Sequence, residues 1–198
     1  MRQLLSGVFC AAGFVAIVSV AALAQTPPKF GSMTTSRLLL LPAQEVTGTA
    51  DGRAWLARFD SVLTARLEAG GVANGWAYPR DAIRYNRQNP TYTTDPRLMG
   101  VQPLKSDKIK DGFSLPEPFA SRLRALLAVA DARNTIVPVV ARIDSTTNPR
   151  AARLQLTLVD GRLSRVLWTG MLEVKYEGST TAAADSLALM TARLFVSN

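Results

Sequence analysis

The chain has 198 residues, a net charge of +8, one cysteine and no histidine. Without histidine, the Ser-His-Asp and Cys-His catalytic arrangements and the usual zinc and copper sites are excluded. The length suits one domain, and the excess of basic residues is spread along the chain, which is typical of a solvated basic surface or of an affinity for anionic partners.

The first 24 residues have the pattern of an export signal. Arg2 precedes an uncharged apolar segment, residues 4–24, which ends in the small-x-small sequence Ala22-Leu23-Ala24 that signal peptidases recognise. We therefore predict a signal peptide over residues 1–24, cut after Ala24, and a periplasmic or secreted protein. Because the segment is long enough to cross a bilayer, a membrane anchor over residues 4–24 is the alternative. Cys10 lies inside the apolar segment, so the processed chain would carry no disulfide.

After the signal, residues 25–36 are rich in Thr, Ser, Pro and Gly and predict a flexible lead-in, and residues 37–198 predict a single α/β domain. The apolar run Leu38–Leu41 predicts a strand buried on both faces. A helix follows, capped by Asp51 and ended by Gly70-Gly71. Its expected buried stripe is Trp55, Phe59, Val62, Leu63 and Leu67, with Asp60 and Glu68 at exposed positions.

The next part of the chain predicts a short strand at 75–79 and then an irregular excursion on the surface at about 80–113. Periodicity is poor there, Pro90, Pro96 and Pro103 interrupt it, and only a brief helix at Asp81–Asn86 is indicated. Long loops of this kind in compact domains are often functional or mobile.

The remaining pattern is clearer. Ser114 to Glu117 has capping-box spacing before a helix that ends near Ala130. The β-branched run 135–143 predicts a strand, in which Pro138 indicates an edge position or a bulge. Leu154, Leu156 and Leu158 then alternate with the polar Arg153, Gln155 and Thr157, so we expect one buried and one wet face.

Asp160-Gly161 predicts a turn into a returning strand, which completes a hairpin. The inward residues expected on that strand are Val166, Trp168, Gly170, Leu172 and Val174. A C-terminal helix carries the stripe Ala183, Leu187, Met190 and Leu194. The fold class is therefore α/β: a two-layer or three-layer sandwich with a mixed sheet of about four to five strands, a C-terminal β-hairpin and three main helices.

No catalytic or cofactor site emerges from the sequence. The carboxylates are explained as caps, turns and exposed helix positions, and Gly48 to Gly52 lacks the lysine of a phosphate-binding loop. We predict no catalytic residues, no cofactor and no metal site, and hence no enzyme.

The excursion contains the residues best suited to bind a partner, because arginine and tyrosine are favoured anchors at protein interfaces. A solvated loop whose tyrosines pack locally is the alternative interpretation. The candidate partner-binding residues are Arg80, Arg84, Tyr85, Arg87, Tyr92 and Arg97.

The strand Leu38-Leu39-Leu40-Leu41-Pro42, the helix after it, and the hairpin segments Leu158–Asp160 and Arg165–Gly170 form a recognisable set. This set resembles the small α/β domain shared by the amino-terminal part of the Tol-system protein TolB, the periplasmic part of curli-type secretion channels, and lipoproteins that activate penicillin-binding proteins. The resemblance covers residues 37–69 and 119–196. A lipidated cysteine at the mature start is missing, and the excursion has no counterpart. The resemblance implies an envelope protein that docks to partners and has no catalytic residues.

We therefore expect an exported, non-enzymatic envelope protein, an adaptor or a docking and assembly module, with an envelope protein or an anionic polymer as its partner. The alternative is a basic module that binds anionic ligands or polymers through residues 80–113, and an enzyme of unfamiliar design comes third. Nucleic acid is not expected as a partner, because an exported protein seldom meets it. Membrane contact is expected only through the signal segment, and nothing in the sequence indicates an oligomeric state.

Overall fold

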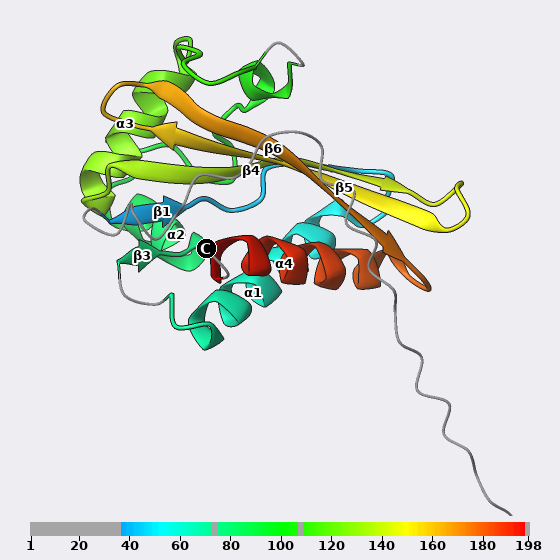
Figure 1. Ribbon diagram of the computed structural model, residues 1–198. Coiled ribbons are helices and arrows are strands. Elements are labelled where there is room, and N and C mark those ends of the chain that lie inside the picture. Colours follow the sequence, from blue (N-terminus) through cyan, green and yellow to red (C-terminus); the bar gives the residue numbers. More distant parts are fainter. Residues whose placement is uncertain (1–36, 73–74, 107–108, 197–198) are drawn as a thin grey trace, which may run out of the picture.

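A computed structural model describes residues 37–72, 75–106 and 109–196. The predicted signal peptide, residues 1–24, and the predicted lead-in, residues 25–36, lie outside the described residues. Figure 1 shows the remainder as a mixed α/β structure in which helices lie against a twisted sheet.

In the part of the chain that the structure describes, six strands form one mixed sheet (Figure 1): β1 (Leu38–Leu40), β2 (Val46–Thr47), β3 (Trp76–Ala77), β4 (Asn134–Asp144), β5 (Arg150–Asp160) and β6 (Arg165–Tyr176). Their order is β3-β1-β4-β5-β6, and β2 pairs with the far end of β4. Strand β1 pairs in parallel with β3 and with β4, and β2 pairs in parallel with β4. The pairs β4–β5 and β5–β6 are antiparallel. The predicted C-terminal hairpin is confirmed as β5 and β6.

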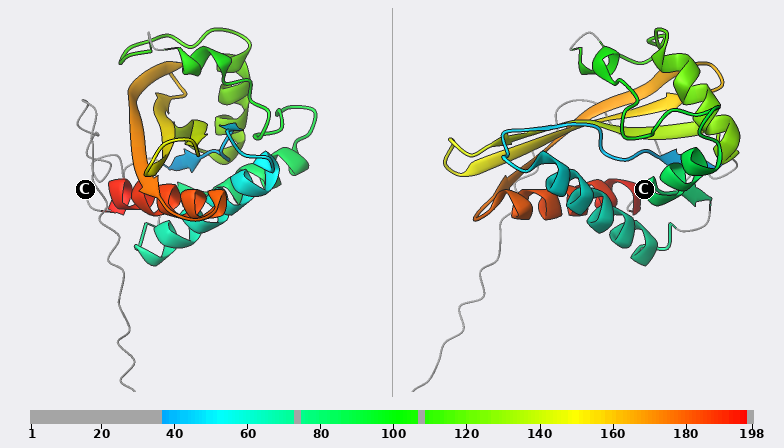
Figure 2. Two further views of the ribbon diagram at one scale, coloured as in Figure 1. Left: turned by 90° about the vertical axis from the view of Figure 1, so that its right-hand side faces the viewer. Right: turned by 180° about the vertical axis from the view of Figure 1, so that it is seen from behind.

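The described residues form four α-helices that cover the sheet: α1 (Gly52–Ala69), α2 (Pro79–Gln88), α3 (Phe119–Ala130) and α4 (Thr180–Val196). Helices α1 and α4 lie side by side on one face, and α3 lies on the other (Figures 1 and 2). The predicted α/β sandwich is therefore the observed fold class. The helix expected at Asp81–Asn86 is present and longer, as α2.

The first hydrophobic core lies between α1, α4 and the sheet. Asp51 caps α1 as predicted, because its carboxylate accepts a hydrogen bond from the Ala54 N–H at 3.0 Å. Trp55, Phe59 and Leu63 then fall on the buried side, and the rings of Trp55 and Phe59 stack with centroids 5.7 Å apart. These side chains pack against the inward leucines of β5, so the apolar stripe of α1 determines which face of the sheet it covers.

The second hydrophobic core lies on the opposite face of the sheet and corrects the prediction of a surface excursion. Met99, Val101, Leu104 and Ile109 are buried together with the apolar face of α3. A short 3-10 helix, η2 (Gln102–Lys105), presents Leu104 to the sheet. These four side chains are therefore part of the core. They follow neither the helical nor the strand period, which is why the sequence pattern did not predict their burial.

The same layer explains why the second face of β5 is not wet. Gln155 and Thr157 are buried, and the Gln155 amide donates a hydrogen bond to the Leu104 carbonyl at 2.7 Å. Arg153, farther along the strand, is exposed as predicted. Val166 also faces the second core, because a register shift between Leu158 and Val159 interrupts the alternation that the sequence predicted for β6.

Two local predictions at strand and helix ends need correction. Pro138 lies in an interior strand and not at an edge, but the predicted bulge is confirmed, because the pairing of β4 with β5 shifts between Pro138 and Val140. The capping box from Ser114 to Glu117 does not form. Ser114 pairs with Arg165 of β6, and α3 begins at Phe119.

Two leucines of one segment provide a test of this second core. Leu104 is 0% exposed and Leu98 is 70% exposed. We expect Leu104→Ala to lower the free energy of unfolding by about 2–4 kcal/mol, because it leaves a cavity under the sheet. Leu98→Ala should change it by less than about 0.5 kcal/mol. Urea denaturation measures both, and equal small effects would show that the segment is not part of the core.

Candidate functional site

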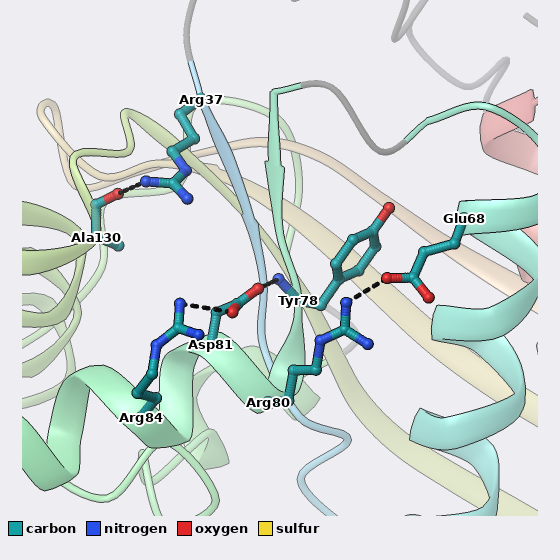
Figure 3. A network of polar contacts seen from close by, with 7 residues as sticks. All are labelled: Arg37, Glu68, Tyr78, Arg80, Asp81, Arg84 and Ala130. Carbon is teal, nitrogen blue, oxygen red and sulfur yellow. Dashed lines mark hydrogen bonds and ion pairs between the residues drawn. The ribbon is translucent and has the colours of Figure 1, made fainter.

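Helix α2 carries four of the six predicted partner-binding residues. Pro79 occupies the first turn, where its missing N–H has no helical partner, and Asp81 accepts a hydrogen bond from the Tyr78 backbone N–H at 2.9 Å (Figure 3). The Asp81 carboxylate also lies at the positive end of the helix dipole. These contacts start the helix firmly at a position where the surrounding sequence is mostly polar.

Three of the predicted residues on α2 are engaged within the protein. Arg80 forms an ion pair with Glu68 of α1, and Arg84 forms one with Asp81 at 2.8 Å (Figure 3). The Arg84 guanidinium also lies 5.4 Å from the centre of the Tyr85 ring, which packs against the second core. Arg87, at the end of α2, is exposed and has no ion pair among the described residues.

The other two predicted residues, Tyr92 and Arg97, lie on the segment after α2 and are exposed. Tyr92 is 62% exposed, because the neighbouring Thr93 turns inward and bonds to the side chain of Asn86 and the carbonyl of Asn89. Leu98, beside Arg97, is 70% exposed. Sequence reasoning did not single out Leu98, since an isolated leucine in an irregular segment carries no pattern.

Gln44, in the segment after β1, holds residues 96–99 in place. Its amide nitrogen donates hydrogen bonds to the carbonyls of Pro42 and Pro96, each at 2.7 Å, and its carbonyl oxygen accepts one from the Met99 N–H at 3.3 Å. One side chain therefore connects residues 96–99 to the segment after β1. The exposed Arg97 and Leu98 are presented from a backbone that is fixed on both sides.

A pocket of about 1030 Å³ lies between α1, the start of α2, the segment after β1 and residues 95–98. Of the predicted residues, Arg80 and Arg97 line it, whereas Arg84, Tyr85, Arg87 and Tyr92 do not. Its apolar lining includes Pro42, Ala43, Leu56, Ala57, Ile83 and Leu98. Its charged lining residues are Arg53, Asp60, Glu68, Arg80, Asp95 and Arg97.

Asp60 is the pocket residue that sequence analysis misplaced, because it was expected at an exposed position of α1. The side chain is partly buried, and one carboxylate oxygen accepts a hydrogen bond from the Ala43 N–H at 2.9 Å. Burial raises the pKa of Asp60 to about 7, although the Ala43 N–H and the positive charge of Arg97 both favour the ionised form. No local pattern predicts this, since the residues that bury Asp60 come from other segments.

The charges around Asp60 are not arranged as a metal site. Among the described residues, no group of three or more His, Cys, Asp and Glu side chains could hold a metal ion. Glu68 is paired with Arg80, and the Asp95 carboxylate accepts a hydrogen bond from the Arg97 backbone N–H at 2.9 Å. The arrangement suits recognition of charged groups on a ligand or partner.

No helix of residues 37–72, 75–106 and 109–196 is both long and apolar enough to cross a bilayer.

No protein-family model and no curated protein matches the chain. Among solved structures, the chain is similar to LpoB of E. coli, with 13% identity, a TM-score of 0.45 and coverage of 89% of this chain and 81% of that one. It is also similar to the PelC dodecamer protein from Paraburkholderia phytofirmans, with 13% identity, a TM-score of 0.41 and coverage of 81% and 86%.

A third similar structure is the lipoprotein GNA1162 from Neisseria meningitidis, with 14% identity, a TM-score of 0.41 and coverage of 80% of this chain and 92% of that one. No residue role in the pocket is carried over from these structures.

The position of Asp60 leads to a prediction for the pH dependence of stability. Its pKa is about 7 in the folded protein and near its ordinary value of 3.8 when unfolded, so the unfolded state ionises first as pH rises. The wild type should therefore lose stability between about pH 4 and pH 7. Asp60→Asn keeps the acceptor for Ala43 and avoids this loss.

We expect Asp60→Asn to be more stable than the wild type by roughly 1–3 kcal/mol at pH 8 and to show no such gain at pH 4. Urea denaturation at several pH values measures the difference. Asp185→Asn is the matched control, because Arg58 pairs with Asp185 on the surface and lowers the pKa of that carboxyl. A gain at pH 8 in the control, or none in Asp60→Asn, would contradict the assignment.

Proposed function

We propose that this chain is an exported, non-enzymatic protein of the cell envelope that docks to an envelope partner protein. The docking surface consists of the exposed residues Arg87, Tyr92, Arg97 and Leu98. The observation that carries the proposal is the exposure of Tyr92 and Leu98 in the same segment, residues 87–98, as two exposed arginines that have no ion pair within the described part of the chain.

The composition of the docking surface favours a protein partner. Tyrosine and arginine are enriched among the residues that dominate binding energy at interfaces, and the exposed Leu98, next to Arg97 in the sequence, offers apolar area to bury. The backbone that presents Arg97 and Leu98 is already fixed by Gln44, so less conformational entropy is lost on binding than for a free loop. A partly apolar surface with cationic groups on a fixed backbone suits the docking of a protein better than it suits catalysis.

The proposed location comes from the amino-terminal sequence. A signal peptide over residues 1–24 would deliver a single domain, residues 37–198, to the periplasm or the exterior. An envelope protein is then the partner that this domain would meet.

An anionic polymer is the second candidate partner. Arg53 lines the pocket and, like Arg87 and Arg97, is exposed without an ion pair among the residues described. Binding of a polymer through these cations would weaken strongly with salt, whereas apolar contacts of Tyr92 and Leu98 with a protein would not.

The export prediction is tested by the mass of the protein recovered from the envelope. We expect the mass of residues 25–198, because signal peptidase cuts after Ala24. Ala24→Asp should block the cut, and the full mass should then be recovered with the membrane fraction. Recovery of the uncut wild-type chain would instead support an anchor over residues 4–24.

The docking surface is tested by in-cell photocrosslinking from position 92. We expect a photoreactive phenylalanine analogue in place of Tyr92 to crosslink one envelope protein. The added double change Arg97→Glu and Leu98→Ala should reduce that crosslink at least tenfold, because it removes a cation and apolar area from an interface centre.

The chain offers a matched control for this experiment. Arg162 and Leu163 form a second exposed Arg-Leu pair in the turn between β5 and β6, where Leu163 is 58% exposed. Arg162→Glu with Leu163→Ala should leave the crosslink unchanged. Equal losses from the two double variants, or no loss from the first, would refute the docking surface.

A further inference from the structure

Asp60 lies in the wall of the pocket as a carboxylate without a cationic partner. Each of the pocket's other two acids is engaged elsewhere: Glu68 pairs with Arg80, and Asp95 bonds to the backbone of Arg97. Asp60 forms no ion pair among the described residues, and its only hydrogen bond is the one from the Ala43 N–H. Since only one oxygen of this partly buried carboxylate is bonded, the other can accept a hydrogen bond from a donor outside the chain.

The groups that face Asp60 from the surrounding elements fit this view. The positive charge of Arg97, from the segment after α2, lowers the pKa of Asp60, but no ion pair joins the two side chains. The segment after β1 contributes the neutral Ala43 and Gln44. Arg53, Glu68, Arg80 and Asp95 line the remainder of the pocket and balance in sign. A cation that enters would therefore find a carboxylate that feels the charge of Arg97 but forms no ion pair with it among the described residues.

The apolar lining adds a requirement for the rest of the ligand. Pro42, Leu56 and Ala57 form walls next to Asp60, so a charged group would reach the carboxylate on an aliphatic stem. Lysine and arginine side chains combine such a stem with a cationic end.

We propose that the pocket binds a lysine or arginine side chain of the docking partner, whose cationic end pairs with Asp60. This inference rests on the proposed docking function, and it adds the chemistry that the partner inserts. The size of the pocket favours a partner segment over a small free amine, because a single alkylammonium would occupy only a minor part of about 1030 Å³. The charged rim can pair with groups on residues that flank the inserted side chain.

The pairing has a defined pH dependence. The burial that raises the pKa of Asp60 to about 7 leaves the carboxyl mostly neutral at pH 5.5 and mostly ionised at pH 8. A cation should bind at least about tenfold more tightly at pH 8 than at pH 5.5. A ligand that bound through the arginines of the rim would show no such increase.

The test titrates the protein, in its exported form, with a capped Ala-Lys-Ala tripeptide. The NMR signal of the Ala43 amide reports on Asp60 directly, because this N–H donates to its carboxylate. We expect the peptide to shift this signal at pH 8, and we expect capped Ala-Glu-Ala and capped Ala-norleucine-Ala not to do so. n-Butylammonium serves as the small-amine arm and should bind more weakly than the lysine peptide.

Two variants make the outcome specific. Asp60→Asn, which keeps the shape and the acceptor for Ala43, should weaken lysine-peptide binding at least tenfold, and Asp185→Asn should leave it unchanged. Binding of the glutamate or norleucine peptide, equal binding of butylammonium, or full binding by Asp60→Asn would overturn the proposal. Crosslinking from position 92 that persists in such a case would show that the docking surface stands without it.

Discussion

The architecture depends on the burial of strand β4 from every side. Its neighbours are β1 and β2 along one edge and β5 along the other, and nearly all of its side chains are buried. A strand of this kind needs apolar cover on both faces. Helices α1 and α4 provide it on one face, but α3 covers only part of the other. Met99, Val101, Leu104 and Ile109 complete the second layer, and their burial determines where the exposed Arg97 and Leu98 are held.

The site follows from this arrangement. The segment that leads from α2 into the second core crosses the residues after β1, where Gln44 bonds to Pro96 and Met99. In crossing, residues 95–98 face α1 across the pocket and enclose Asp60. A pocket with apolar walls and charged residues therefore forms where an irregular segment passes from one layer of the structure to the other. The rise in the pKa of Asp60 is a consequence of that enclosure and not of a neighbouring acid.

Much of the fold could be predicted from the sequence where local patterns are regular. The stripe of Trp55, Phe59 and Leu63, the cap at Asp51 and the hairpin after Asp160 each follow from spacing alone. The second core could not be predicted, because Met99, Val101 and Leu104 share no period. The site was predicted only in part. Arg87, Tyr92 and Arg97 are exposed, and their partner-binding role stays a prediction. Tyr85 packs inward, and the burial of Asp60 depends on contacts distant in sequence.

The attachment of the exposed segment to the core has a consequence for transplanting it. Arg97 and Leu98 directly precede the buried Met99 in the sequence, and the buried Val101 follows two residues later. The buried residues that follow and the Gln44 amide therefore fix the backbone that presents Arg97 and Leu98. A peptide of residues 89–98 alone would lack these contacts. A scaffold meant to display these side chains faithfully would also need the anchors from Met99 to Leu104 and a strand end that supplies an equivalent glutamine.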